Sequence, residues 1–193
     1  MSAKKINVKT ERFYSAHHAL LRIAGDNLTK AETKEPGWLD WQFSTITFSS
    51  LAIEAFCNAV GEKVIHNWND FENCSPKAKL RLICEYLNIS YDSSKEPWQG
   101  VLWLLKIRNL IAHPKPEPLK AETVISQKEH AEQRRGFPKS KLEKELTLKN
   151  AQKSVLVVNQ LIDLFCAELT PEQNFGIVGD MSTSVSTMHD DAE

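Results

Sequence analysis

Three residues with complementary chemistry, Arg108, Asn109 and His113, stand at the end of the apolar run WLLKIRNLIAHP. At about 100° per helical residue, Arg108 and Asn109 project near the apolar face, where an unpaired polar group is costly. Arginine offers a rigid fork of donors that matches phosphate oxygens, and histidine exchanges protons near neutral pH. A carboxamide can hold the imidazole or a phosphate oxygen. The set suits phosphodiester chemistry. The alternative interpretation is structural: Arg108 pairs with a buried acid, while Asn109 and His113 cap the helix end.

The sequence does not suggest a metal or a cofactor beside these residues. No cluster of carboxylates accompanies them, and no Cys/His group has the spacing of a zinc site. The cysteines are scattered without a CxxC pair, so we expect reduced and mostly buried thiols. They are Cys57, Cys74, Cys84 and Cys166.

A basic region follows the motif. Residues 115–153 contain ten Lys and Arg against six Glu, although the formal net charge of the whole chain is −1. Such a local excess can bind the phosphates of RNA, and it can equally be a solvated face of a loop and a helix. The candidate RNA-binding residues are Arg134, Arg135, Lys139 and Lys141.

Helices are expected to position the motif. Apolar residues recur at steps of three and four, and prolines or polar residues separate the segments. Pro76 and Pro97 open helices, Pro114 ends one, and Ser140 with Glu143 has the pattern of a capping box. No strong strand alternation is evident, so the sequence predicts an all-α bundle of four to five helices. The expected helices are 11–29, 38–68, 77–87, 98–112 and 140–169.

The length of 193 residues suits one domain. We expect a helical domain over residues 1–169, with a Pro-rich connection at 114–140, and a flexible acidic tail at 170–193. Residues 181–193 of this tail are expected to be disordered because they are small and polar. The N-terminus lacks the apolar run of a signal peptide, and no stretch approaches the ~20 apolar residues of a membrane span. These features favour a cytoplasmic protein that does not contact a membrane.

The run from Arg108 to His113 resembles the signature of the HEPN superfamily (higher eukaryotes and prokaryotes nucleotide-binding). That signature is an Arg, four to six residues and a His, often with a polar residue directly after the Arg. Here it stands at the end of an apolar helix, before a Pro-rich loop and among other helices, and the resemblance covers residues 11–169. It implies an HEPN-like helical bundle.

The resemblance also implies a function. HEPN proteins of this kind are metal-independent endoribonucleases, usually homodimers with a composite active site, in phage defence or in toxin–antitoxin pairs with a separate antitoxin chain. On this chain, Arg108 would stabilise the phosphorane charge, His113 would move protons, and Asn109 would orient the phosphate or the His. Many family members carry an acid on a neighbouring helix, so Glu54 either pairs with Arg108 or His113 or is an ordinary boundary residue.

Two other readings stay open. Some HEPN proteins lack catalysis, so the chain is alternatively a non-catalytic HEPN-like module that binds RNA, a nucleotide or a partner protein. A third possibility is a plain interaction bundle in which Arg108 is structural.

Overall fold

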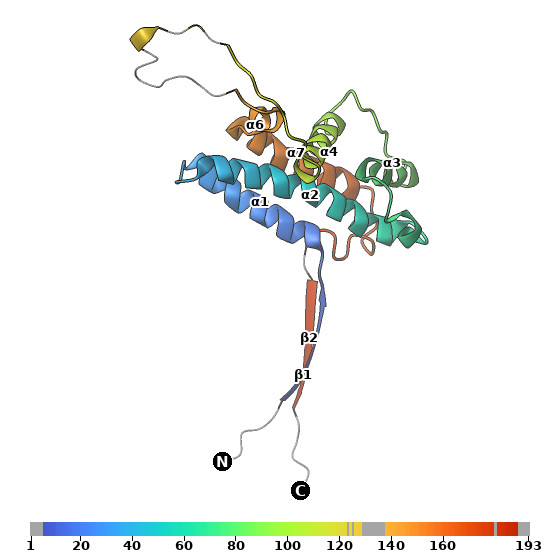
Figure 1. The fold of residues 1–193 in the computed structure, drawn as a ribbon. Coiled ribbons are helices and arrows are strands. Elements are labelled where there is room, and N and C mark those ends of the chain that lie inside the picture. Colours follow the sequence, from blue (N-terminus) through green and yellow to red (C-terminus); the bar gives the residue numbers. More distant parts are fainter. Residues whose placement is uncertain (1–5, 123, 125, 129–137, 180, 189–193) are drawn as a thin grey trace, which may run out of the picture.

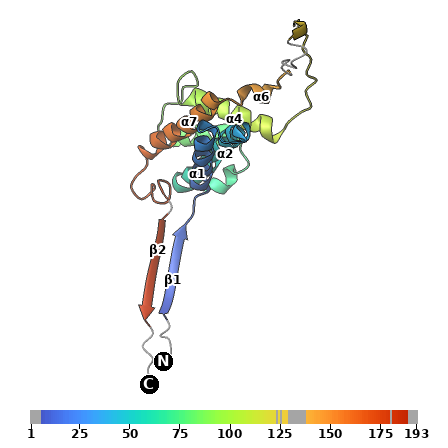
Figure 2. The same cartoon turned by 90° about the vertical axis from the view of Figure 1, so that its left-hand side faces the viewer.

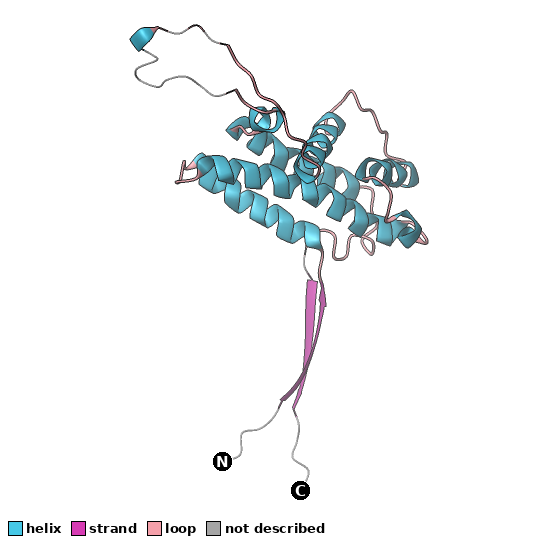
Figure 3. Cartoon of the chain, in the orientation of Figure 1, coloured by secondary structure: helices cyan, strands magenta, loops and turns pink. Residues whose placement is uncertain are grey.

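The chain forms a bundle of helices with a pair of strands at one end (Figure 1). The structure, a computed structural model, describes residues 6–122, 124, 126–128, 138–179 and 181–188. The all-α prediction is confirmed, since helices dominate the described residues (Figure 3). The helices are α1 (Ala16–Glu32), α2 (Trp38–Val64), the 3-10 helix η1 (Trp68–Phe71), α3 (Pro76–Tyr86), α4 (Trp98–Ala112), α6 (Lys141–Glu145) and α7 (Leu148–Cys166).

Helix α2 is the centre of the bundle and packs against α1, α3, α4 and α7. Its stripe of apolar residues, including Ile46, Ile53 and Val60, is buried as the spacing predicts. Small polar residues let α7 approach closely, and the hydroxyl of Ser154 on α7 donates to Ser49 on α2 at 3.1 Å. By length and composition α2 could also cross a membrane, and half of its most apolar 18-residue window is buried against other helices.

Local signals place most helix ends correctly. Pro76 is the first residue of α3, and the Ser75 hydroxyl accepts from the Ala78 N–H at 3.3 Å. The capping box of Ser140 and Glu143 is present at the start of α6. The single helix expected at 140–169 is wrong, because the chain is extended at Thr147, whose hydroxyl caps α7. Two short-range capping signals divide this region into α6 and α7.

Two strands accompany the helices. Strands β1 (Ile6–Phe13) and β2 (Met181–Met188) pair antiparallel, with Ile6 opposite Met188 and Phe13 opposite Met181. They project from the bundle as a narrow arm (Figure 2). The first helix therefore begins at Ala16 and not near residue 11. The disorder expected from residue 181 onward is corrected for 181–188, while 189–193 lie outside the described residues.

The segment before β2 belongs to the bundle and is not a free tail. Ile177 is fully buried, and its carbonyl oxygen lies 3.0 Å from Nε2 of His17, which is also fully buried. Gly176 has a φ of +77°, and a Cβ there would clash with the ring of Phe13 at the base of β1. The packing of the bundle therefore continues beyond residue 169 as far as Ile177.

The packing of α4 against α7 depends on Gly100. A Cβ at this position would collide with the side chain of Val157 on α7. We expect Gly100→Ala to lower the free energy of unfolding by about 1–3 kcal/mol, the usual cost of overpacking. Gly25→Ala is the matched control, because nothing lies within 4 Å of a Cβ there. In the interior of α1 this control should raise stability by about 0.5–1 kcal/mol, and urea unfolding of both variants measures the difference. Equal stabilities would contradict the close approach of α4 and α7.

Candidate functional site

The last turn of α4 presents Arg108 at the edge of the core. Gly100, Leu104 and Ile107 of α4 are buried against the bundle, which fixes how the helix is rotated. Arg108 lies next to this buried face, and 27% of its side chain is exposed. The guanidinium is therefore held by the fold and still reaches solvent.

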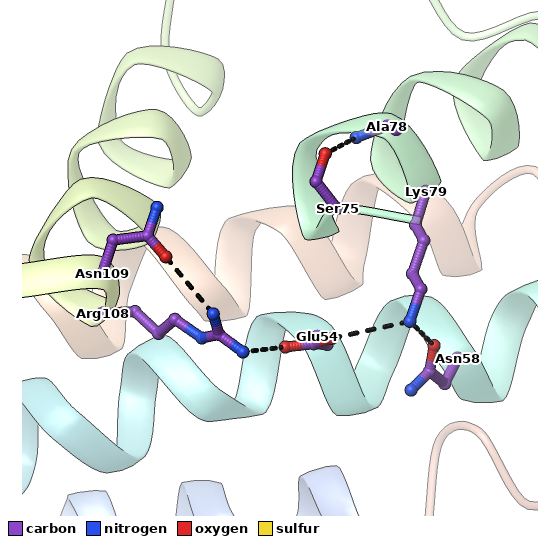
Figure 4. Close-up of polar contacts among 7 residues, drawn as sticks. All are labelled: Glu54, Asn58, Ser75, Ala78, Lys79, Arg108 and Asn109. Atoms are coloured by element: carbon purple, nitrogen blue, oxygen red, sulfur yellow. Dashed lines mark hydrogen bonds and ion pairs between the residues drawn. The ribbon is translucent and has the colours of Figure 1, made fainter. Parts of the chain in front are cut away.

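Arg108 makes an ion pair with Glu54 in the middle of α2. Its Nη2 lies 3.0 Å from Oε2 of Glu54, whose side chain is 26% exposed (Figure 4). Of the two partners expected for Glu54, the structure selects Arg108. The alternative that Arg108 pairs with an acid is thus realised, although this acid is only partly buried.

Asn109 holds the same guanidinium. Its carboxamide oxygen accepts from Nη1 of Arg108 at 3.2 Å. Asn109 is exposed, so the prediction that it projects near the apolar face is wrong. The reason is that the buried residues of α4 centre on the direction of Arg108, and Asn109 lies one residue further on, about 100° around the helix axis. The side chain of Asn109 binds Arg108, and within the described residues it makes no hydrogen bond to the imidazole of His113.

Lys79 and Asn58 complete the cluster, and the sequence analysis missed both. The Nζ of Lys79 on α3 lies 2.9 Å from Oδ1 of Asn58 and 3.5 Å from Oε1 of Glu54 (Figure 4). Only 2% of the Lys79 side chain is exposed. Two spacings could have indicated them, because residues four apart lie on the same face of a helix. Lys79 precedes the buried Ile83 by four residues, and Asn58 follows Glu54 by four residues.

This Glu54 cluster, consisting of Glu54, Asn58, Lys79, Arg108 and Asn109, carries one carboxylate and two cations. Its formal charge is +1, which favours an anion at the exposed end of the cluster. Two of the five N–H groups of Arg108 bind protein oxygens within the described residues. The remaining donors are the ones that could bind phosphate oxygens.

His113 stands apart from the cluster. It is the residue that ends α4, where its backbone N–H donates to the Asn109 carbonyl at 3.0 Å. Its side chain is exposed, and within the described part of the chain it makes no hydrogen bond or ion pair to Arg108, Asn109 or Glu54. Backbone capping by His113 is present, and the imidazole is left open to solvent.

Of the four candidate RNA-binding residues, the structure describes Lys139 and Lys141. Lys139 and Lys141 are exposed, at and next to the start of α6. Helix α6 packs on α4, where Nε1 of Trp103 donates to Glu145 at 3.0 Å. Among the described residues, neither lysine side chain makes a hydrogen bond or ion pair to Arg108 or His113. Arg134 and Arg135 lie outside the described residues.

Two thiols lie behind the cluster and remain protonated. Burial raises the pKa of Cys57 to about 12, with Cys84 and Glu54 raising it further and Lys79 opposing them. Burial also raises the pKa of Cys84 to about 12. Neither thiol therefore adds a negative charge to the cluster at neutral pH. Among the described residues, no group of three or more His, Cys, Asp and Glu is placed to hold a metal ion.

Comparison of the chain with family models, with curated proteins and with solved structures finds no match. The geometry of the residues therefore carries the functional argument.

Proposed function

We propose that this protein is a metal-independent endoribonuclease of the HEPN type, acting in phage defence or as the toxin of a toxin–antitoxin pair in the cytoplasm. One observation supports this most. Arg108 is fixed by Glu54 and Asn109 at a solvent-exposed helix end, and the same end presents an open imidazole, that of His113. A fixed guanidinium and a mobile proton carrier are what cleavage of RNA without a metal requires.

In this proposal the ribose 2′-oxygen attacks the adjacent phosphorus and the bond from phosphorus to the 5′-oxygen breaks. His113 takes the proton of the 2′-hydroxyl or delivers a proton to the leaving 5′-oxygen. The free N–H groups of Arg108 stabilise the charge on the phosphorane oxygens, and Asn109 keeps the guanidinium in place. The products are a 2′,3′-cyclic phosphate and a 5′-hydroxyl.

The separation of His113 from the cluster supports a composite site between two copies of the chain. In a homodimer, Arg108 of one copy and His113 of the other could meet at one phosphate. Light scattering should then give a mass of about two chains, and a separate antitoxin would bind over the same surface. Lys139, Lys141, Arg134 and Arg135 are the proposed contacts to the flanking RNA backbone.

The proposal is tested by incubating the protein with a labelled RNA oligonucleotide in EDTA. We expect cleavage that leaves a 2′,3′-cyclic phosphate end, and no cleavage of the DNA oligonucleotide of the same sequence, which lacks the attacking hydroxyl. Mass spectrometry of the fragments identifies the end group. Intact RNA at an excess of protein over substrate would contradict the proposal.

A second function is favoured by the neutralisation of Arg108. Because Glu54 already pairs with this guanidinium, the cluster can serve only to hold α2 and α4 together. The chain would then be a non-catalytic module that binds RNA, a nucleotide or a protein. Such a module would bind RNA in a filter assay without cutting it, and it would tolerate replacement of His113.

A further inference from the structure

The arm formed by β1 and β2 leaves the bundle where α1 begins and extends away from α4 and α6 (Figure 1, Figure 2). Within the described residues its sheet consists of these two strands alone, so each strand has one edge without a backbone partner. A two-stranded sheet is at best marginally stable in water, and further strands stabilise it. Unpaired edges are also the surfaces to which strands of other chains add. The arm therefore offers an edge for another strand.

The outer strand β1 is open to solvent along its length. Residues 6 and 8–13 are all exposed. Ile6 and Val8 are two residues apart, so they share one face of the strand, and they are 55% and 56% exposed. A strand added beside β1 places its side chains about 5 Å from these, which removes part of their apolar surface from water.

The centre of β1 is charged, and β2 is not. Lys9 and Glu11 share the other face of β1, where they stand opposite the neutral Val185 and Thr183 of β2. Neither charge has an ion-pair partner within the described residues. Cross-strand pairs of opposite charge stabilise a sheet, and like charges destabilise it. A strand added to β1 must therefore present an acid and a base in matching positions.

A second copy of β1 meets this requirement in one register. When two copies run antiparallel with Thr10 opposite Thr10, residues 7–13 pair, and Lys9 of each copy stands opposite Glu11 of the other. A shift of one residue places Lys9 opposite Thr10 or Arg12. A shift of two residues places Lys9 opposite Lys9 or Glu11 opposite Glu11. The charges of β1 therefore select this register, in which two ion pairs are related by a two-fold axis.

The same register brings apolar surface together on the opposite face of the strand. Val8 stands opposite Arg12 of the second copy, and Ile6 stands opposite its Tyr14, which lies one residue beyond β1 and is 59% exposed. The guanidinium of Arg12 already lies over the ring of Tyr14, 5.3 Å from its centroid. Pairs of an aromatic and a β-branched side chain stabilise neighbouring strands. Both faces of β1 are thus complementary to a second copy.

We propose that the arm is a dimerisation element, in which β1 pairs antiparallel with β1 of a second copy of this chain about Thr10. The four strands form one sheet in the order β2, β1, β1, β2. The two bundles then lie at opposite ends of this sheet, because each arm extends away from its own bundle. The contact does not involve α4, so it is independent of RNA cleavage and of any meeting of Arg108 and His113 between copies. If copies also met through α4, the two contacts together would assemble more than two chains.

Charge reversal tests this pairing by sedimentation equilibrium of the full chain. Lys9→Glu places two acids opposite each other at both ion pairs, and Glu11→Lys does the same with two bases. We expect either change to weaken association about 10- to 100-fold. Within one chain these positions face Val185 and Thr183, so the arm itself should form in each variant.

Two rescues follow from the same geometry. A mixture of the Lys9→Glu and Glu11→Lys proteins should associate as tightly as the unchanged protein, because the acids of one chain then face the bases of the other. The double variant Lys9→Glu/Glu11→Lys should also recover the association on its own. Lys77→Glu, at an exposed position on α3, is the control and should leave the association unchanged.

A cysteine at the two-fold axis tests the register directly. Residues directly opposite each other in antiparallel strands have Cα atoms about 4.5–5.5 Å apart, a separation that a disulfide can span. Thr10→Cys, made in a Cys74→Ser background because Cys74 is exposed, should form a covalent dimer on mild oxidation. Val8→Cys in the same background should not, because Val8 lies opposite Arg12 and about 13 Å along the strand from its own copy.

Three outcomes would overturn the proposal. The first is an unchanged protein that stays monomeric at millimolar concentration. The second is association that neither charge reversal weakens, which would assign the contact to another surface such as α4. The third is equal cross-linking of Thr10→Cys and Val8→Cys, which would show that the arms do not pair in this register.

Discussion

Replacing His113 with alanine is expected to slow RNA cleavage by about two to four orders of magnitude, the usual contribution of a general acid or base. The imidazole is exposed and makes no hydrogen bond or ion pair to the cluster residues within the described part of the chain, and the backbone N–H of residue 113 remains to cap α4. The variant should therefore keep the melting temperature of the parent protein. Single-turnover cleavage of a labelled RNA in EDTA measures the rate.

His66→Ala is the matched control for this experiment. His66 is also exposed. It lies two residues after the C-terminal end of α2, and so away from the end of α4 that carries His113. We expect the control to cleave RNA at the parent rate. If His113→Ala and His66→Ala cleave equally fast, His113 is not the proton carrier, and the non-catalytic module becomes the better account.

Replacing Glu54 with alanine is expected to cost stability as well as activity. The change leaves Lys79, which is 2% exposed, with Asn58 as its remaining partner, and it frees Arg108. Removing one partner of a fully buried ion pair costs about 3–5 kcal/mol. Because Glu54 is itself a quarter exposed, we expect about 2–3 kcal/mol here. For a chain of this length that corresponds to a fall of about 5–10 °C in melting temperature.

A double variant separates stability from activity. In the Glu54→Ala background, Lys79→Met should recover much of the lost stability, because no buried charge is then left without a carboxylate. It should not recover cleavage, because Arg108 still lacks Glu54. Glu62→Ala, at an exposed position on the same helix, is the control and should change neither property. Strictly additive stabilities would show that Glu54 and Lys79 do not interact.

The sequence was most informative where short-range chemistry decides the structure. The bounds of α4 follow from its apolar run and from Pro114, and the start of α3 follows from Ser75 and Pro76. The pairing of Glu54 with Arg108 was among the arrangements that the resemblance to the HEPN signature implied.

Other features depend on how distant segments meet. The burial of Lys79 needs the carboxylate of Glu54, 25 residues away, so no pattern within α3 could establish it. The exposure of Asn109 depends on how α4 is rotated against α2 and α7. The strands have little apolar alternation, and each is a strand only because the other end of the chain lies beside it.

The pairing of β1 with β2 sets an order for folding. It joins Ile6 to Met188 and so closes a loop of nearly the whole chain. In an unfolded chain the length-dependent entropy of such a closure amounts to roughly 5 kcal/mol, more than an isolated two-stranded sheet can recover. Once the bundle has formed, the contact between His17 and Ile177 already brings the two strand bases together. The ladder can then close from its base outward, so the last contacts to form join the first and last described residues of the chain.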